Sequence, residues 1–154
     1  YAPGCEGNKY RDISQASISP LSDASTEAVF GELFESKKNL TAKALLATGQ
    51  RIPGVGNGVL QDILFNARIH PKRKTSTFSS SEQAELYRSV RETLSEMTSE
   101  GGRDTQKDLY GENCGYRTIL SAKTWKSPCP VCEGPITKEA YMGGTIYYCP
   151  HCQR

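Results

Sequence analysis

Four cysteines near the carboxy terminus have the spacing of a metal site. Cys129 and Cys132 are separated by two residues, as are Cys149 and Cys152, and sixteen residues lie between the pairs. Two intervening residues let both thiolates of a tight turn reach one ion, and two such turns joined by a hairpin complete a tetrahedral shell of four sulfurs. We therefore predict one structural Zn²⁺ bound by these four cysteines. Disulfides or a redox pair are the alternatives.

The residues around these cysteines predict a short β-hairpin between the two turns. Pro130 and Pro150 stiffen the turns, and Gly143-Gly144 allows the chain to reverse direction between them. Four thiolates leave no position for a catalytic water, so the predicted role of the zinc is structural. His151, inside the second turn, is a surplus candidate ligand. Because zinc peptides of this kind gain about 10–16 kcal/mol of apparent binding energy, the hairpin is expected to fold only with its metal.

A glycine-rich turn is the second segment that could bind a ligand. Its sequence, Pro53-Gly54-Val55-Gly56-Asn57, lies between two predicted helices. Glycines let the backbone approach a ligand closely, and the start of the following helix presents unpaired N–H groups to an anion such as phosphate. Asn57 can donate its side-chain amide to the same oxygen. A plain connection between helices has the same pattern and is the alternative.

Positive charge is concentrated around this turn. Residues 37–74 carry eight lysines or arginines and one aspartate, a net charge of +7, whereas residues 1–35 carry −4 and the whole chain +2. This concentration favours a polyanionic partner, with a solvated helix face as the alternative. No run approaches the ~20 apolar residues of a membrane span, which excludes that class of protein. The cations near the turn, which we predict to contact DNA, are Lys43, Arg51, Arg68 and Lys72.

Apolar residues at helical spacing predict four helices that would position these groups. The first is capped by Ser22, Asp23 or Ser25 and ends near residue 36, and the others span about residues 40–48, 58–67 and 80–100. Asn39 or Thr41 would cap the second, and Ser79-x-x-Glu82 forms a capping box before the fourth. The stripes expected to be buried in the first and last helices are Val29, Phe30, Leu33 and Phe34, and Leu86, Val90, Leu94 and Met97.

The predicted fold class is mainly α with a small β part. Residues 1–20 are expected to be a linker or the tail of a missing β-domain, residues 21–116 a helical DNA-binding domain, and residues 117–154 the zinc finger. The chain opens without methionine, so we expect a piece of a longer protein. Cys5 and Cys114 are expected to be free thiols or to fill space in the core, in a reducing, cytoplasmic compartment.

The run from Gln50 to Pro71 resembles the helix–two-turns–helix signature of the formamidopyrimidine-DNA glycosylase and endonuclease VIII family. Residues 20–23 resemble the entry into that domain. The glycine pair at 101–102 and the Gly-Tyr pair at 115–116 recur at the family's positions. The four cysteines and the final Cys-Gln resemble the family's terminal zinc finger. The resemblance extends over residues 20–154.

This resemblance implies a helix–two-turns–helix domain followed by a four-cysteine zinc β-hairpin ribbon. It implies a DNA-binding carboxy-terminal part of a base-excision-repair DNA glycosylase and AP lyase, which grips the backbone phosphates of damaged double-stranded DNA. Asn57 matches the family's phosphate-binding asparagine, and Lys43 a lysine that faces the same phosphates. The implied partners are duplex DNA and the amino-terminal catalytic domain of the same protein, in a monomer at the bacterial nucleoid.

The sequence departs from the family pattern at several positions. Gly144 stands where the family has a phosphate-binding arginine, and Val59 and Asp62 replace its tyrosine and glutamate. The family's nucleophile is an amino-terminal proline followed by glutamate, which Tyr1-Ala2 does not match. We therefore expect no catalytic residue in this chain and no activity from it alone.

Three further hypotheses stay open on the sequence. The first is a non-catalytic nucleic-acid-binding module that kept the family fold. The second is an RNA-binding helix–hairpin–helix domain, which also uses Pro-Gly-x-Gly turns to hold phosphate. The third is a zinc ribbon that binds another protein, although this hypothesis leaves the +7 segment unexplained.

Overall fold

The computed structural model describes residues 19–36, 39–48 and 51–154. Within these ranges the chain forms helices followed by a single antiparallel hairpin. The elements are α2 (Glu27–Ser36), α3 (Ala42–Ala47), α4 (Asn57–Asn66), the 3-10 turn η1 (Thr75–Thr77), α5 (Ser80–Ser99), β1 (Thr137–Tyr141) and β2 (Gly144–Tyr148). The predicted fold class, mainly α with a small β ribbon, is confirmed.

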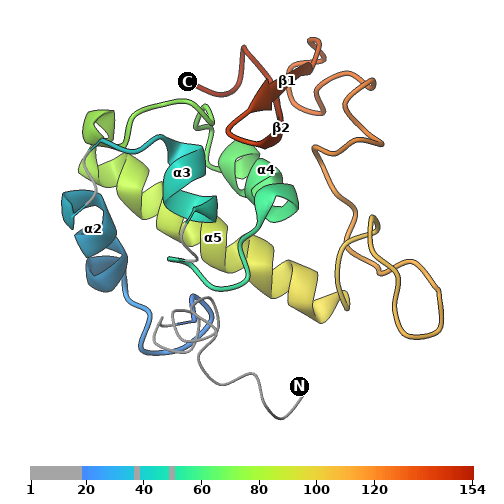
Figure 1. Ribbon diagram of the computed structural model, residues 1–154, viewed down its shortest axis with the longest axis horizontal. Coiled ribbons are helices and arrows are strands. Elements are labelled where there is room, and N and C mark those ends of the chain that lie inside the picture. The colour runs from blue at the N-terminus through green and yellow to red at the C-terminus, as the bar shows by residue number, and fades with distance from the viewer. Residues whose placement is uncertain (1–18, 37–38, 49–50) are drawn as a thin grey trace.

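The long helix α5 supports two other helices, which pack on it (Figure 1). Helices α2 and α4 contact α5, and α3 contacts α4. The hairpin lies on the far side of α4, which strand β2 contacts. Helix α4 is therefore sandwiched between the helical core and the ribbon. None of the helices in the described ranges combines the length and the apolar content needed to cross a membrane.

Side-chain caps begin two helices where the sequence predicts them. The Thr41 hydroxyl accepts a hydrogen bond from the Ala44 N–H at the start of α3. The Ser79 hydroxyl accepts from the Glu82 N–H while the Glu82 carboxylate accepts from the Ser79 N–H, so the capping box of α5 is complete. These bonds satisfy N–H groups that have no partner within the helix, which is why the helices begin at these residues.

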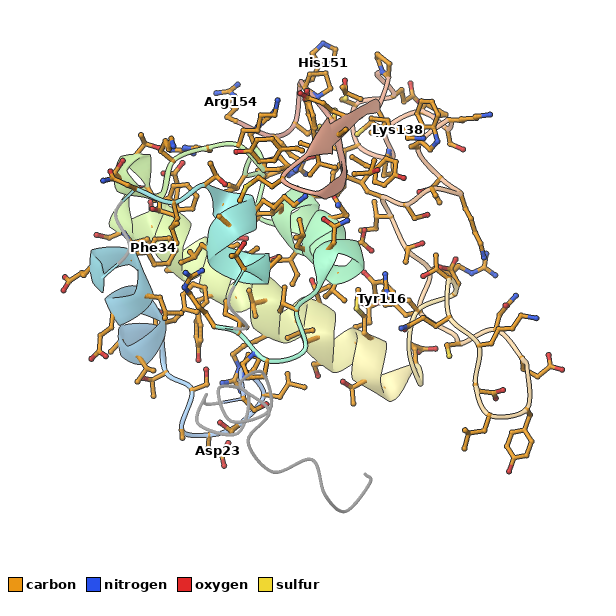
Figure 2. The ribbon with its side chains drawn as sticks, in the orientation of Figure 1. Asp23, Phe34, Tyr116, Lys138, His151 and Arg154 are labelled. Carbon is orange, nitrogen blue, oxygen red and sulfur yellow. The ribbon has the colours of Figure 1, made fainter. Side chains whose placement is uncertain are left out.

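The core between α2 and α5 is largely the predicted one. Phe30 and Phe34 are buried, and Phe30 packs against Tyr87 of α5 with ring centroids 5.5 Å apart. Figure 2 shows Phe34 between α2 and α5. The four predicted residues of α5 are all buried. The prediction for Val29 is wrong, because this side chain is 36% exposed. One residue along a helix is a rotation of about 100°, which turns Val29 away from the face that Phe30 buries.

A second, smaller core joins the ribbon to the helical part. It contains Phe65 of α4 together with Leu120, Ile136, Tyr147 and two of the ribbon cysteines. The division between residues 116 and 117 remains a prediction. The shared cluster means that any boundary there separates two parts that pack together.

Buried Asp62 ties the loop after α5 to α4. Its carboxylate accepts hydrogen bonds from the Tyr116 hydroxyl (3.0 Å) and from the backbone N–H groups of Ile119 (2.9 Å) and Leu120 (2.8 Å). Burial raises the pKa of Asp62, and these three donors oppose the rise. Figure 2 shows Tyr116 on the side of the helices that this loop covers. The residue that departs from the family pattern therefore organises the chain between α5 and the ribbon.

Removing this carboxylate should destabilise the protein. Asp62→Ala leaves two N–H groups and a hydroxyl without their acceptor, and an unsatisfied buried polar group costs about 1–3 kcal/mol. We expect the free energy of unfolding, measured by urea denaturation, to fall by about 3 kcal/mol or more. Asp108→Ala is the control, because Asp108 also accepts two backbone N–H bonds but in an exposed loop. Equal losses in the two variants would contradict the assigned role of Asp62.

Candidate metal centre and nucleic-acid interface

The four predicted zinc ligands converge at one end of the ribbon. Their Sγ atoms all lie within 4.8 Å of one another, with 3.8 Å between Cys129 and Cys152 and 3.4 Å between Cys132 and Cys149. Zinc–sulfur bonds of about 2.3 Å in a tetrahedron place sulfurs about 3.8 Å apart, so this cluster is the right size for one ion. The prediction of a four-cysteine zinc site is supported by this geometry.

Backbone hydrogen bonds shape each cysteine turn. The Cys129 N–H donates to the Gly134 carbonyl (2.8 Å), and the Cys129 carbonyl accepts from the Glu133 N–H (2.9 Å). Glu133 adopts a left-handed φ of 60°, which lets the chain fold back on the first turn. In the second turn the Cys149 N–H donates to the Gln153 side-chain oxygen (2.9 Å). Both knuckles are therefore held by contacts that do not use the sulfur atoms.

The thiols need a cation before all four can ionise. Burial disfavours the Cys129 thiolate, but the N–H groups of Cys132 and Val131 and the thiols of Cys149 and Cys132 together outweigh burial and lower the pKa of Cys129 to about 7. Burial and the neighbouring sulfurs raise the pKa of Cys152 to about 12. Four mutually repelling thiolates become stable together when a divalent ion neutralises them, which is the chemistry that Zn²⁺ supplies.

His151 lies outside the cluster of four sulfurs. Its Nδ1 atom is 4.0 Å from Cys132 Sγ, and the residue is exposed at the outer end of the ribbon (Figure 2). Because the four sulfurs suffice for a tetrahedral shell, the geometry leaves His151 as a neighbour of the site and not a ligand.

The end of the chain fastens the ribbon to the helical part. The Gln153 amide, 2% exposed, donates to the Ile69 carbonyl (2.9 Å). The Arg154 N–H donates to the Arg68 carbonyl (3.0 Å), and the Arg154 carbonyl accepts from the His70 N–H (2.9 Å). The same glutamine bonds a zinc-turn backbone N–H, so the metal site and the segment after α4 are linked through one buried side chain.

The glycine-rich turn leads directly into the exposed first turn of α4. Gly54 has a φ of +85°, a left-handed conformation that favours glycine. Gly56 is the N-cap and has no side chain to cap the helix, and Asn57 is the first helical residue. The first N–H groups of a helix have no partner within it. Gly54, Gly56 and Asn57 are all exposed, so these N–H groups are available to an anion.

The hairpin meets this first turn of α4 at the Thr145 carbonyl. The side-chain amides of Asn57 and Gln61 each donate to that oxygen at 3.0 Å. The Gln61 oxygen in turn accepts from the Tyr147 N–H (3.1 Å). Gly144 lies beside Asn57, since a Cβ atom built on Gly144 would be 3.2 Å from the Asn57 amide. Gln61 was not among the predicted site residues, although a polar side chain among the apolar positions of a helix was a signal for it.

Lys43 lies beneath the hairpin tip. It is 4% exposed, its Nζ donates to the Tyr141 carbonyl, and it lies 5.7 Å from the Tyr141 ring centroid. Burial lowers the pKa of Lys43. The tip itself consists of Met142 and Gly143, both with positive φ (50° and 71°), and Gly144 is the first residue of β2. A two-residue turn with this backbone matches the twist of the strands it joins.

The other predicted cations lie in different surroundings. Lys72 forms an ion pair with Glu139 of β1 and lies 5.1 Å from the Tyr141 ring centroid. The Arg51 guanidinium donates to the carbonyls of Ala44 and Thr48 and so caps the carboxy end of α3. Arg68 is exposed but follows the carboxy end of α4. The structure therefore brings Lys43, Asn57 and Lys72 to the hairpin and leaves both arginines elsewhere.

The fold pairs two cations of the +7 segment with acidic side chains. Arg73 forms a bidentate ion pair with Glu82 (2.6 and 2.9 Å). Lys72 forms an ion pair with Glu139. Lys74 is exposed. Lys37 and Lys38 lie outside the described residues. The acidic partners come from α5 and β1, which the sequence alone does not place beside this segment.

Loss of a zinc ligand should unfold the ribbon. Cys149→Ser removes one of the four sulfurs, so we expect the zinc content to fall well below one ion per chain. Amide hydrogen exchange at residues 137–148 should then lose its protection. Cys114→Ser is the control, because Cys114 is a free thiol outside the cluster. A Cys149→Ser protein that keeps both its zinc and the protected hairpin would exclude this site.

Comparisons with known proteins place the chain in a family. The family model "Formamidopyrimidine-DNA glycosylase H2TH domain" matches residues 17–108. A formamidopyrimidine-DNA glycosylase of Gluconobacter oxydans is 31% identical over 97% of this chain and 55% of its own length. The corresponding protein of Thermus thermophilus is 32% identical over 97% and 59%. This chain spans somewhat more than half the length of these curated relatives.

Solved structures agree with this placement. The crystal structure of the MutM (Fpg) protein from Thermus thermophilus superposes with a TM-score of 0.81 at 28% identity, over 95% of this chain and 57% of that one. A complex between Lactococcus lactis Fpg and DNA containing an abasic site gives 0.77 at 22% identity, over 94% and 54%, which shows likeness of fold. The chain belongs to the formamidopyrimidine-DNA glycosylase H2TH domain family.

Proposed function

We propose that this chain is the DNA-binding part of a formamidopyrimidine-DNA glycosylase and that it holds the backbone of duplex DNA near a damaged base. We call the surface that would bind the DNA backbone the phosphate clamp. It consists of the first turn of α4, Gly56 to Gly58, and the start of β2, Gly144-Thr145. The observation behind it is the junction at the Thr145 carbonyl, which joins the zinc hairpin to an uncapped helix start.

The chemistry of the clamp suits a phosphate. The uncapped N–H groups of the helix start favour negative charge, and the Gly56 and Gly144 positions add no side chain that would keep the backbone at a distance. The Asn57 amide has two N–H groups and uses one for the Thr145 carbonyl, which leaves the other for an oxygen of the ligand. Contacts of this kind position a duplex without reading its sequence.

The lysines of the site contribute in two ways. Lys43 holds the hairpin tip through the Tyr141 carbonyl and adds positive charge from below. Lys72 can exchange Glu139 for a phosphate oxygen, because this ion pair is about one-third exposed on both sides. The relatives' names and the solved complexes of Lactococcus lactis Fpg with damaged DNA support this assignment.

The proposed function of this chain is binding, so the chemical steps need another domain. We propose that glycosylase and AP lyase chemistry comes from an amino-terminal catalytic domain, and that the zinc-loaded chain acts with it as a monomer on chromosomal DNA. The sequence-tolerant grip of the present chain would keep the damaged duplex in place while that domain reacts with the base. A domain that grips only the backbone leaves the choice of lesion to its partner.

Asn57→Ala should weaken DNA binding without changing its salt dependence. A hydrogen bond to a charged group is worth about 1.5–3 kcal/mol, so the affinity for a short duplex should fall roughly ten- to hundred-fold. The log–log salt slope depends on neutralised phosphates and should stay at its wild-type value, about −3 to −5 for three to five contacts. Asn66→Ala, at the other end of α4, is the control. Binding by the wild-type chain that is indifferent to salt would refute the proposal.

Gly144→Arg should strengthen binding and steepen its salt dependence. The new side chain begins 3.2 Å from the Asn57 amide, where a small shift of that flexible side chain accommodates it. One additional phosphate contact should change the log–log slope by about −0.9. Fluorescence anisotropy over a salt series measures both effects. A variant that stays folded and zinc-loaded but gains neither affinity nor slope would show that Gly144 does not face DNA.

A further inference from the structure

The phosphate clamp contains little free positive charge. Gly144 has no side chain, Lys43 is buried beneath the hairpin, and Lys72 is paired with Glu139. An anion held by N–H groups alone binds less tightly than one that also meets a cation, because hydrogen bonds between charged groups are the stronger ones. A cation brought to the clamp from elsewhere in the chain would correct this shortage.

Arg103, from the loop after α5, lies against the first turn of α4. A Cβ atom built on Gly58 would be 2.1 Å from Nη1 of Arg103, 2.9 Å from its Cζ and 3.1 Å from its Nη2. The guanidinium group thus occupies the space that any larger residue at position 58 would need. Asn57 and Gly58 are consecutive helical residues, about 100° apart around the axis, so Gly144 and Arg103 flank neighbouring sides of the same turn.

The loop holds the Arg103 backbone firmly. Arg103 pairs with Tyr116 in a β-bridge, the Tyr116 N–H donates to the Gly102 carbonyl (3.0 Å), and the Asp104 N–H donates to the Tyr116 carbonyl (2.7 Å). Tyr116 is itself bonded to Asp62 inside α4. The backbone of Arg103 is therefore placed beside α4 by the buried tie between this loop and the helix.

The guanidinium group of Arg103 has unused donors. Within residues 19–36, 39–48 and 51–154 it forms neither a hydrogen bond nor an ion pair, although the side chain is half-buried. A guanidinium carries five N–H donors that match the oxygens of a phosphate. The positive charge of Arg103 favours the ionised form of the nearby Asp62 carboxylate. The Asp62 oxygens, however, already accept three hydrogen bonds from other groups.

We propose that Arg103 binds the same DNA backbone phosphate as the first turn of α4 and supplies there the positive charge that Gly144 lacks. This inference rests on the proposed DNA-binding function and adds a residue that lies outside the basic segment of the sequence. In this arrangement the phosphate has helix N–H groups and the Asn57 amide on one side and a guanidinium group on the other. Glycine at position 58 is required because it leaves room for that group.

The first test compares charge at position 103. The zinc-loaded full chain is titrated into a short fluorescent duplex with a tetrahydrofuran abasic-site analogue, over a series of salt concentrations. Arg103→Gln should reduce the affinity by about ten-fold and make the log–log salt slope shallower by about 0.9. Arg103→Lys should keep the slope. Arg88→Gln is the control, because Arg88 is exposed on α5 and paired with Glu85.

The second test moves the guanidinium group without altering it. Gly58→Ala places a methyl group where Nη1 now lies, so it should weaken binding as Arg103→Gln does. Alanine is also a better helix former than glycine, so the melting temperature should not fall, which separates lost contact from lost stability. In the Arg103→Gln background the added methyl group should have no further effect on affinity.

The outcomes separate the two proposals. If the wild-type chain shows no salt-dependent DNA binding, the proposed function itself is refuted. If the wild type binds with a salt slope but Arg103→Gln changes neither affinity nor slope, only the role of Arg103 is overturned. A lower melting temperature for Arg103→Gln with unchanged binding would assign this arginine to the buried Asp62 charge alone.

Discussion

Two side-chain amides of α4 bond the carbonyl oxygen of Thr145, and the placement of the ribbon depends on this contact. Asn57 and Gln61 are one helical turn apart, so both reach the same strand atom from one face of α4. The Gln61 oxygen then accepts from the next N–H of that face of β2, which sets the strand position along the helix. A slip of the hairpin by one residue would leave buried amide groups without partners, and such groups are costly.

The zinc cluster and this junction support each other. A two-stranded hairpin is marginally stable alone, and the four sulfurs close it at the end away from the tip. Gln153 links the metal site to the helical part. Its buried side-chain amide accepts from the Cys149 N–H of the second cysteine turn and donates to the Ile69 carbonyl after α4. The metal therefore fixes a strand whose other end contacts the first turn of α4. By that coupling a structural ion would stabilise the proposed phosphate clamp, although the cysteines lie at the other end of the hairpin.

Electrostatics at this surface differ from what a count of charges suggests. Glu139 and Glu82 pair with Lys72 and Arg73 of the basic segment, and Arg51 caps a helix. The polar groups exposed at the clamp are the backbone N–H groups at the start of α4 and the Asn57 amide. Arg103 lies beside them. Fixed dipoles of this kind favour an anion at one place and not over a whole face, which suits a contact that sets the register of a duplex.

Local patterns were enough to predict that the helices, the hairpin and the zinc cluster form, although α2 begins after Thr26 and not after the predicted caps Ser22, Asp23 or Ser25. Capping residues such as Thr41 and Ser79 act over three or four positions, and the Cys-x-x-Cys spacing is a property of one turn, so the sequence determined these features. The contacts of the clamp were decided by tertiary structure. Lys72 and Glu139 are far apart in the chain, as are Gly58 and Arg103, and only packing of the ribbon and the loop against α4 brings them together. Charge and exposure depend on such neighbours, which is why the sequence indicated the type of ligand but not the cation that meets it.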